Sequence, residues 1–145
     1  MATVQDILQN KGSQVHTIDP NATVFAAAEL MNQHKIGCLL VCEEGRLVGI
    51  FTERDILQRV VGERRDPDQT KVSEVMTDEV ACCRPHTGME EARGVMQHRR
   101  IRHLPVLCDE DKIQGMISIG DLNAHQNNTQ EMTISLLEQY IYGQA

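Results

Sequence analysis

The chain has 145 residues, of which 41% are hydrophobic and 24% charged, and it carries a formal net charge of −7. A chain of this length buries roughly two-thirds of its unfolded surface, which excludes a disordered protein and predicts one domain or two very small ones. The acidic balance argues against nucleic acid as a partner, and no apolar run approaches the ~20 residues that a membrane span requires.

The first half of the chain predicts an alternation of helices and extended segments. After an N-terminal helix and a short extended segment, apolar residues at helical spacing predict a second helix. Its apolar face consists of Val24, Ala27, Leu30 and Met31. Two apolar strands then form a hairpin around an acidic turn, and another helix begins at Thr52. The extended segments of this half are 15–18, 38–42 and 47–51.

The second half of the chain repeats the first. Three pairs of segments align: 4–8 with 72–76, 20–31 with 85–96, and 49–56 with 115–122. In the body of the repeat the offset is 65 before the hairpin turn and 66 after it, because the second copy has one extra residue. The extended segments of the second copy are 80–83, 103–107 and 113–117. We expect four parts: an N-terminal helix with the first repeat (1–62), a linker (63–71), the second repeat (72–126) and a helical tail (127–145).

Each copy has the order β-α-β-β-α, which predicts an α+β fold with a three-stranded sheet and two helices on one face of it. A unit of about 50 residues is too small to be stable with a bare sheet face, so we expect the other copy to cover it about a pseudo-two-fold axis. This packing creates two related clefts between the copies, which are candidate ligand sites. The apolar tail, 129–142, is expected to form a helix that packs on this module or on a second chain.

Both copies carry the pattern Gly-x-x-Thr/Ser-x-x-Asp where a strand meets a helix, as Gly49 to Asp55 and Gly115 to Asp121. Thr or Ser at a helix N-terminus lies beside unpaired N–H groups that attract a phosphate. An Asp on the first turn can accept two hydrogen bonds from a ribose, and Gly lets the backbone approach a flat base. The same pattern is also close to a helix capping box, which serves stability alone, so the residues leave both interpretations open.

Three motifs in chain order resemble those of paired cystathionine-beta-synthase (CBS) domains: TERDI (52–56), IRHLPV (101–106) and MISIGD (116–121). The resemblance covers residues 3–126 and is greatest to small stand-alone CBS pairs of bacteria and plant mitochondria. It implies a regulatory sensor that binds an adenosine-containing ligand (AMP, ADP, ATP, NAD or S-adenosylmethionine), with no obligatory cofactor. It further implies a homodimer, formed through the CBS faces and the C-terminal helix, and a regulated protein partner that the sequence does not identify.

The resemblance also assigns residues to the two clefts. It implies that Asp55 and Asp121 bind a ribose. The principal cleft is expected to combine Ser118, Asp121, Arg102 and His103, and a weaker cleft to combine Thr52, Asp55 and Arg54. The apolar surroundings of the adenine are expected to be Ile18, Ile36, Cys82 and Ile101. In the alternative interpretation these four residues belong to the core, and His103 is an exposed strand histidine.

The five cysteines form no CxxC pair and no zinc-ligand spacing, so they are expected to be small buried side chains. The alternative is a redox-sensitive thiol, with Cys108 as the most exposed candidate, or Cys38. Without signal-peptide features, the chain is expected in the cytoplasm. No base, nucleophile or metal ligands are arranged for turnover, so an enzyme is not expected. A ligand-independent interaction scaffold and a thiol redox regulator are the alternative functions.

Overall fold

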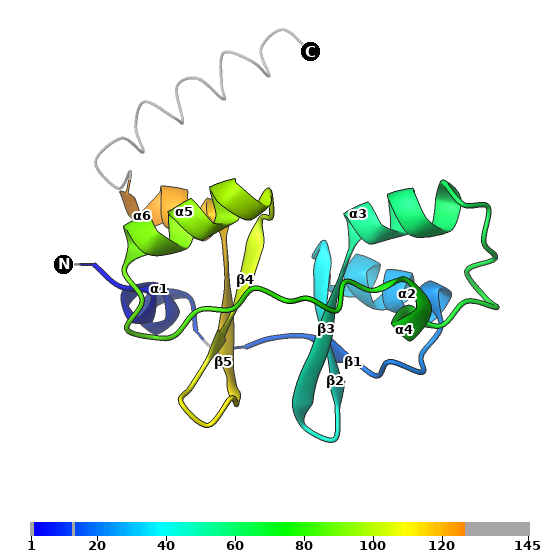
Figure 1. Ribbon diagram of the computed structural model, residues 1–145, viewed down its shortest axis with the longest axis horizontal. Helices are drawn as coiled ribbons and strands as arrows, with labels where there is room; N and C mark the ends of the chain where they lie inside the picture. The colour runs from blue at the N-terminus through cyan, green and yellow to red at the C-terminus, as the bar shows by residue number, and fades with distance from the viewer. Residues whose placement is uncertain (1, 13, 127–145) are drawn as a thin grey trace, which may run out of the picture.

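The computed structural model describes residues 2–12 and 14–126, and it has the α+β fold expected from the sequence. Figure 1 shows two similar lobes side by side, each with a β-hairpin flanked by helices, and the two hairpin turns lie at the same end of the molecule. The predicted C-terminal helix, 127–145, lies outside the described residues. In the described part of the chain, no helix is long and apolar enough to cross a membrane.

The two lobes contain corresponding elements. The first lobe contains β1 (Thr17–Ile18), α2 (Val24–His34), β2 (Cys38–Glu43), β3 (Arg46–Thr52), α3 (Glu53–Asp55), the π-helix η1 (Ile56–Val61) and α4 (Val72–Val75). The second lobe contains α1 (Val4–Lys11), α5 (Met89–Arg99), β4 (His103–Leu107), β5 (Ile113–Ser118) and α6 (Ile119–Gln126). The predicted hairpins are therefore confirmed to within one residue at each strand end.

In the first lobe, β2 is the central strand of a three-stranded sheet, with β1 parallel and β3 antiparallel to it. Helix α2 begins after Thr23, whose side chain accepts a backbone hydrogen bond of 3.1 Å from the first turn, and it ends at Lys35, which has a left-handed backbone. The apolar face of α2 packs on β2 and β3 as predicted. The buried residues of this contact are Val24, Ala27, Met31, Leu39, Val41 and Phe51.

In the second lobe, the prediction of a strand over 80–83 was wrong. Only Cys83 pairs with the hairpin, through a single parallel bridge to Val106. In the first lobe, the Leu40 N–H donates to the His16 carbonyl (3.1 Å) and so supports β1. The residue that corresponds to Leu40 at an offset of 65 is Pro105, which has no N–H to donate. The second sheet therefore lacks that hydrogen bond and has two strands in the described structure.

The short helices that lead into each repeat are exchanged between the lobes. Helix α1 precedes the first repeat, but its residues Val4, Ile7 and Leu8 are buried in the core of the second lobe. Helix α4 precedes the second repeat and is buried in the core of the first. The exchange is reciprocal, because Val4 N–H donates to Thr87 O (2.9 Å) and the corresponding Val72 N–H donates to Ala22 O (2.8 Å). These matched contacts fit the predicted pseudo-two-fold relation and interlock the lobes.

Candidate functional site

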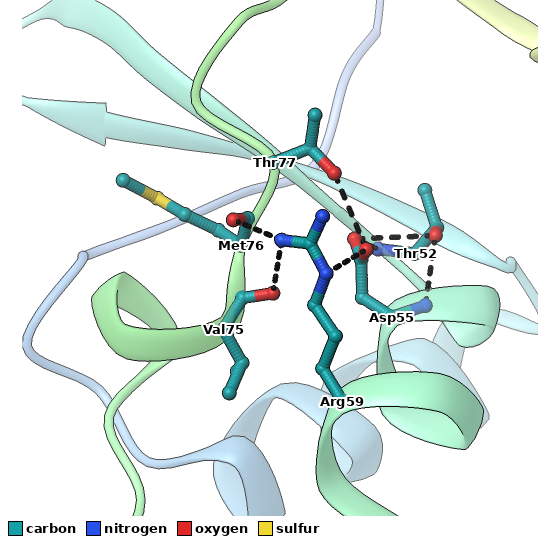
Figure 2. Close-up of polar contacts among 6 residues, drawn as sticks. All are labelled: Thr52, Asp55, Arg59, Val75, Met76 and Thr77. Carbon is teal, nitrogen blue, oxygen red and sulfur yellow. Dashed lines mark hydrogen bonds and ion pairs between the residues drawn. The ribbon is translucent and has the colours of Figure 1, made fainter. Parts of the chain in front are cut away.

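The site is built around the carboxylate of Asp55, which is 6% exposed at the start of the helix that follows β3. The Thr52 backbone N–H donates to Asp55 Oδ2 (3.0 Å), and the Thr77 hydroxyl donates to Asp55 Oδ1 (3.2 Å), as Figure 2 shows. Arg59 Nε lies 3.8 Å from Asp55 Oδ1. Donors from two sides therefore fix the orientation of this carboxylate.

Arg59 links the site to the exchanged helix α4. Its Nη1 donates to Met76 O (2.8 Å) and to Val75 O (3.3 Å), at the point where α4 ends (Figure 2). The sequence interpretation missed both Arg59 and Thr77. The i, i+4 spacing of Asp55 and Arg59 was an available signal. No local signal identifies Thr77, because its contact depends on the exchange of the lead-in helices.

The helix after Asp55 differs from the plain α-helix that the sequence predicts. Residues 56–61 form a π-helix, in which the Gly62 N–H donates to Leu57 O (2.8 Å). The corresponding segment of the second lobe, α6, is an ordinary α-helix. Such π-helical segments are rare and frequently occur at functional sites. The two lobes therefore differ at the element that presents the carboxylate.

A pocket of about 520 Å³ opens beside Asp55. Both repeats contribute to its lining. The first repeat contributes Gly37, Ile50, Thr52, Glu53, Arg54, Asp55, Leu57, Gln58 and Arg59, and the second contributes Thr77, Glu79, Val80, Ala81, Arg99, Arg100, Ile101, Arg102 and His103. Five of the lining residues are arginines and three are acidic, in a chain whose net charge is −7. The pocket is thus locally cationic.

The grouping of the predicted site residues differs from the expected one. Arg102 and His103, which were expected beside Asp121, also line the pocket with Asp55, while His103 pairs with Ser118 across the hairpin and interacts with Asp121. The segment before β4 reaches across to the first repeat, where Arg54 Nη1 donates to Arg100 O (3.1 Å). Of the eleven predicted residues, the pocket is lined by Thr52, Arg54, Asp55, Ile101, Arg102 and His103, but not by Ile18, Ile36, Cys82, Ser118 and Asp121.

Asp121 has a different environment from Asp55. Lys11 Nζ donates to Asp121 Oδ2 (2.7 Å) and to Met116 O (2.9 Å), and the Ser118 N–H also donates to Asp121 Oδ2 (2.8 Å). Burial by itself would raise the pKa of Asp121, but the hydrogen bonds and charge of Lys11 and the hydrogen bond from Ser118 outweigh it and lower the pKa. Asp121, which was expected to bind a ribose, therefore already forms an ion pair with Lys11.

All five cysteines are free thiols, and they differ in exposure. Cys38 and Cys83 are buried, as expected, and burial raises the pKa of each to about 12. Cys82 is exposed and borders a separate hollow. Cys108 is half-buried and therefore less exposed than Cys82, so the prediction that Cys108 is the most exposed thiol was wrong. Among the described residues, no group of three or more His, Cys, Asp or Glu could hold a metal ion.

Comparison with known proteins adds to this geometry. A family model, the CBS domain, matches residues 3–62 and 72–127. The chain is 40% identical to the CBS domain-containing protein YhcV of Bacillus subtilis, over 87% of this chain and 86% of that protein. It is 35% identical to the mitochondrial CBS domain-containing protein CBSX3 of Arabidopsis thaliana, over 97% of this chain and 72% of that protein.

Solved structures have the same fold. A protein with CBS domains from Burkholderia ambifaria is 39% identical, with a TM-score of 0.86 over 90% of this chain and 97% of that chain. A more distant CBS domain pair was solved in complex with 5′-methylthioadenosine and S-adenosyl-L-methionine. It is 24% identical, with a TM-score of 0.78 over 89% of this chain and 98% of that chain, and at this identity the likeness concerns the fold alone.

Proposed function

The chain belongs to the CBS domain family, and from this membership we propose that it is a non-catalytic regulatory module that binds an adenine nucleotide between its two repeats. The observation that carries the proposal is the cationic pocket of about 520 Å³ beside the buried carboxylate of Asp55. A pocket of this size is in the range of small-molecule sites. The ligand class is proposed from membership of the CBS family, one distant member of which was solved with two adenosine derivatives.

We propose that the ribose hydroxyls donate to Asp55. A carboxylate offers about four acceptor positions. The Thr52 N–H (3.0 Å) and hydroxyl (3.3 Å) contact Oδ2 and the Thr77 hydroxyl (3.2 Å) contacts Oδ1, which leaves a position on Oδ1 beside Arg59. The adenine is proposed to lie against the apolar lining residues Ile50, Val80 and Ile101. This arrangement uses one charged group for orientation and apolar side chains for contact area, as is usual in small-molecule sites.

The phosphates are proposed to bind the basic segment that precedes β4. Arg99, Arg100 and Arg102 line the pocket, and their guanidinium groups form no hydrogen bond or ion pair with another described residue. Arg groups bind phosphates through paired N–H donors, so their unused donors suit a charged ligand. We therefore expect AMP, ADP, ATP or NAD to bind better than uncharged adenosine.

The regulatory action is proposed to follow from the position of the pocket between the repeats. A ligand that contacts both repeats stabilises one relative arrangement of the lobes, and a partner that prefers this arrangement then binds more tightly.

We also propose a homodimer. Large apolar side chains are exposed on the helices of the first lobe, namely Phe25, Leu57 and Val61. Sedimentation of the full chain tests this association.

Isothermal titration with AMP, ADP, ATP, NAD and S-adenosylmethionine tests the proposal. We expect binding by the wild type, loss of that binding in Asp55→Asn, and retention in the matched control Asp121→Asn. Recovery of the ligand unchanged after incubation tests the absence of turnover. Binding that survives Asp55→Asn, or no binding by any of the five compounds, would overturn the proposed site and favour the ligand-independent scaffold.

The contribution of the basic segment is measured with Arg102→Gln. This change should weaken ATP binding several-fold, reduce its dependence on salt and leave adenosine binding unchanged. Arg64→Gln is the matched control, because Arg64 is an exposed linker residue outside the pocket. Equal effects of the two substitutions on ATP binding would contradict the phosphate assignment.

A further inference from the structure

Each pocket residue has a counterpart at the same position of the other repeat. Several of these counterparts contact one another or share a partner. At the repeat offsets, Asp121 corresponds to Asp55 and Met116 corresponds to Ile50. Neither Asp121 nor Met116 lines the pocket beside Asp55 or the hollow beside Cys82. The pseudo-two-fold relation therefore places the region around Asp121 and Met116 at the position of a second cleft.

Lys11 occupies the position next to Asp121. Its ammonium group contacts both Asp121 Oδ2 (2.7 Å) and Met116 O (2.9 Å). Lys11 comes from the last turn of α1, which packs in the second lobe because the lead-in helices are exchanged. Helix α4 is shorter by four residues, and the chain that follows it places the neutral hydroxyl of Thr77 on Asp55 instead. Both carboxylates therefore have a cation nearby, but Lys11 Nζ lies 2.7 Å from Asp121 Oδ2, whereas Arg59 Nε lies 3.8 Å from Asp55 Oδ1.

Two further side-chain contacts occur at positions that correspond to residues of the open pocket. Cys38 Sγ lies 3.8 Å from Met116 Sδ, whereas the corresponding His103 and Ile50 both line the open pocket. The rings of His16 and His34 are stacked, with centroids 3.9 Å apart. The residues that correspond to these histidines, Ala81 and Arg99, line the open pocket as well. At these two pairs of positions, residues that line the open pocket have counterparts in the other repeat that contact each other.

We propose that the Asp121 cleft is closed by Lys11, so that each chain binds one nucleotide and Lys11 determines this stoichiometry. The inference rests on the proposed function, because it concerns the same ligand class. The ammonium group neutralises Asp121 and, together with the Ser118 N–H, occupies its Oδ2. The Cys38 thiol contacts Met116, whose carbonyl oxygen also accepts from Lys11. Lys11 is therefore a specificity-determining residue that limits binding to the Asp55 pocket.

Isothermal titration with AMP and with ATP measures the stoichiometry. The wild type should bind one molecule per chain, and Lys11→Met should bind two, the second being lost again in Lys11→Met/Asp121→Asn. Lys112→Met is the matched control, since Lys112 also pairs with a carboxylate of the second repeat, Glu110, at 3.5 Å. It should keep one site. Two sites in the wild type, or one site in a folded Lys11→Met protein, would overturn the inference.

A second measurement separates this inference from the proposed function. The carboxyl titration of Asp121 can be followed by carbon NMR without any ligand, and Lys11→Met should raise its pKa while Lys112→Met leaves it unchanged. If neither nucleotide binds any variant, the proposed function fails. An unchanged Asp121 titration in Lys11→Met would then show that Lys11 does not hold this carboxylate, and the closure would fail independently.

Discussion

The backbones of Ile50 and Thr77 are joined by two hydrogen bonds of 2.9 Å, one in each direction. Through them the chain that leaves α4 pairs with the outer edge of β3, as an isolated antiparallel bridge. The same segment directs the Thr77 hydroxyl to Asp55. The exchanged helix thus both completes the core of the first lobe and supplies a group to the pocket.

This crossing gives Gly49 a structural role. The sequence instead suggested that the glycine lets the backbone approach a bound base. A methyl group at Gly49 would lie 2.5 Å from Met76 Sδ and 3.0 Å from the backbone Thr77 O. At the corresponding Gly115, the nearest atom would be Leu8 Cδ2, at 2.8 Å. Both glycines therefore make room for the exchanged lead-in segments.

Gly49→Ala should destabilise the protein by about 1–3 kcal/mol, because the backbone at Thr77 cannot move without breaking its pairing with Ile50. Gly115→Ala is the matched change and should cost less, since a Leu8 methyl group can rotate away. Urea denaturation of both variants measures the difference. A larger effect at Gly115 would contradict this account of the crossing.

The only two phenylalanines of the chain form a natural pair for testing the core. Phe51 is 0% exposed in the core of the first lobe, and Phe25 is 48% exposed on α2. Phe51→Ala should lower the free energy of unfolding by about 3–5 kcal/mol, because it leaves a cavity among close-packed side chains. Phe25→Ala should change it by less than about 0.5 kcal/mol. Chemical denaturation at neutral pH checks both values, and a similar cost for the two would refute the assigned burial.

The pH dependence of stability should contain a contribution from His103. Burial lowers the pKa of His103, and Lys11 and Arg102 add to this effect, while Asp121 and Glu53 oppose it. Below the unfolded value of about 6.5, the unfolded chain takes up a proton that folded His103 resists. The stabilisation is therefore present above this pH and is lost as the pH falls through the pKa of the folded protein.

Urea denaturation at pH 7.5 and pH 5.0 measures this contribution. The wild type should lose more stability between the two pH values than His103→Gln does. His86→Gln is the control, because His86 is exposed outside the pocket, and it should behave as the wild type does. Identical losses in all three proteins would show that His103 does not titrate as its surroundings require.

The thiols should react with iodoacetamide in the order of their exposure. At pH 8, Cys38 and Cys83 should remain unmodified in the folded protein, because each is buried and has a pKa of about 12. Exposed Cys82 should react earlier, although burial also raises its pKa. Mass spectrometry of peptides after timed quenching gives the rates, with the urea-unfolded chain as the reference. Rapid labelling of Cys38 in the folded state would instead favour the thiol redox alternative.

The sequence by itself determined the repeat, the two hairpins, the apolar faces of the helices and the family. These features depend on residues that are close in the chain: alternation predicts a strand, a 3.6-residue period predicts a helix, and a constant offset identifies a duplication. The Thr52-x-x-Asp55 pattern also made a capping box one of two interpretations, and the structure contains it, since both of its hydrogen bonds are local. The absence of the strand predicted over 80–83 also has its cause in the sequence, because Pro105 has no N–H to donate, but the prediction did not take this into account.

Only the tertiary structure decided which carboxylate faces the basic segment before β4 and which one is paired with Lys11. Lys11 and Asp121 are 110 residues apart, and the contact exists because α1 packs in the lobe of the second repeat. Nothing in a local pattern distinguishes this exchange from its alternative, because the apolar face of a short lead-in helix fits either core. Which core a lead-in helix joins depends on the total apolar surface that the whole chain buries, and this total includes contacts between residues far apart in the sequence. The same exchange places Lys11 beside Asp121 and Thr77 beside Asp55.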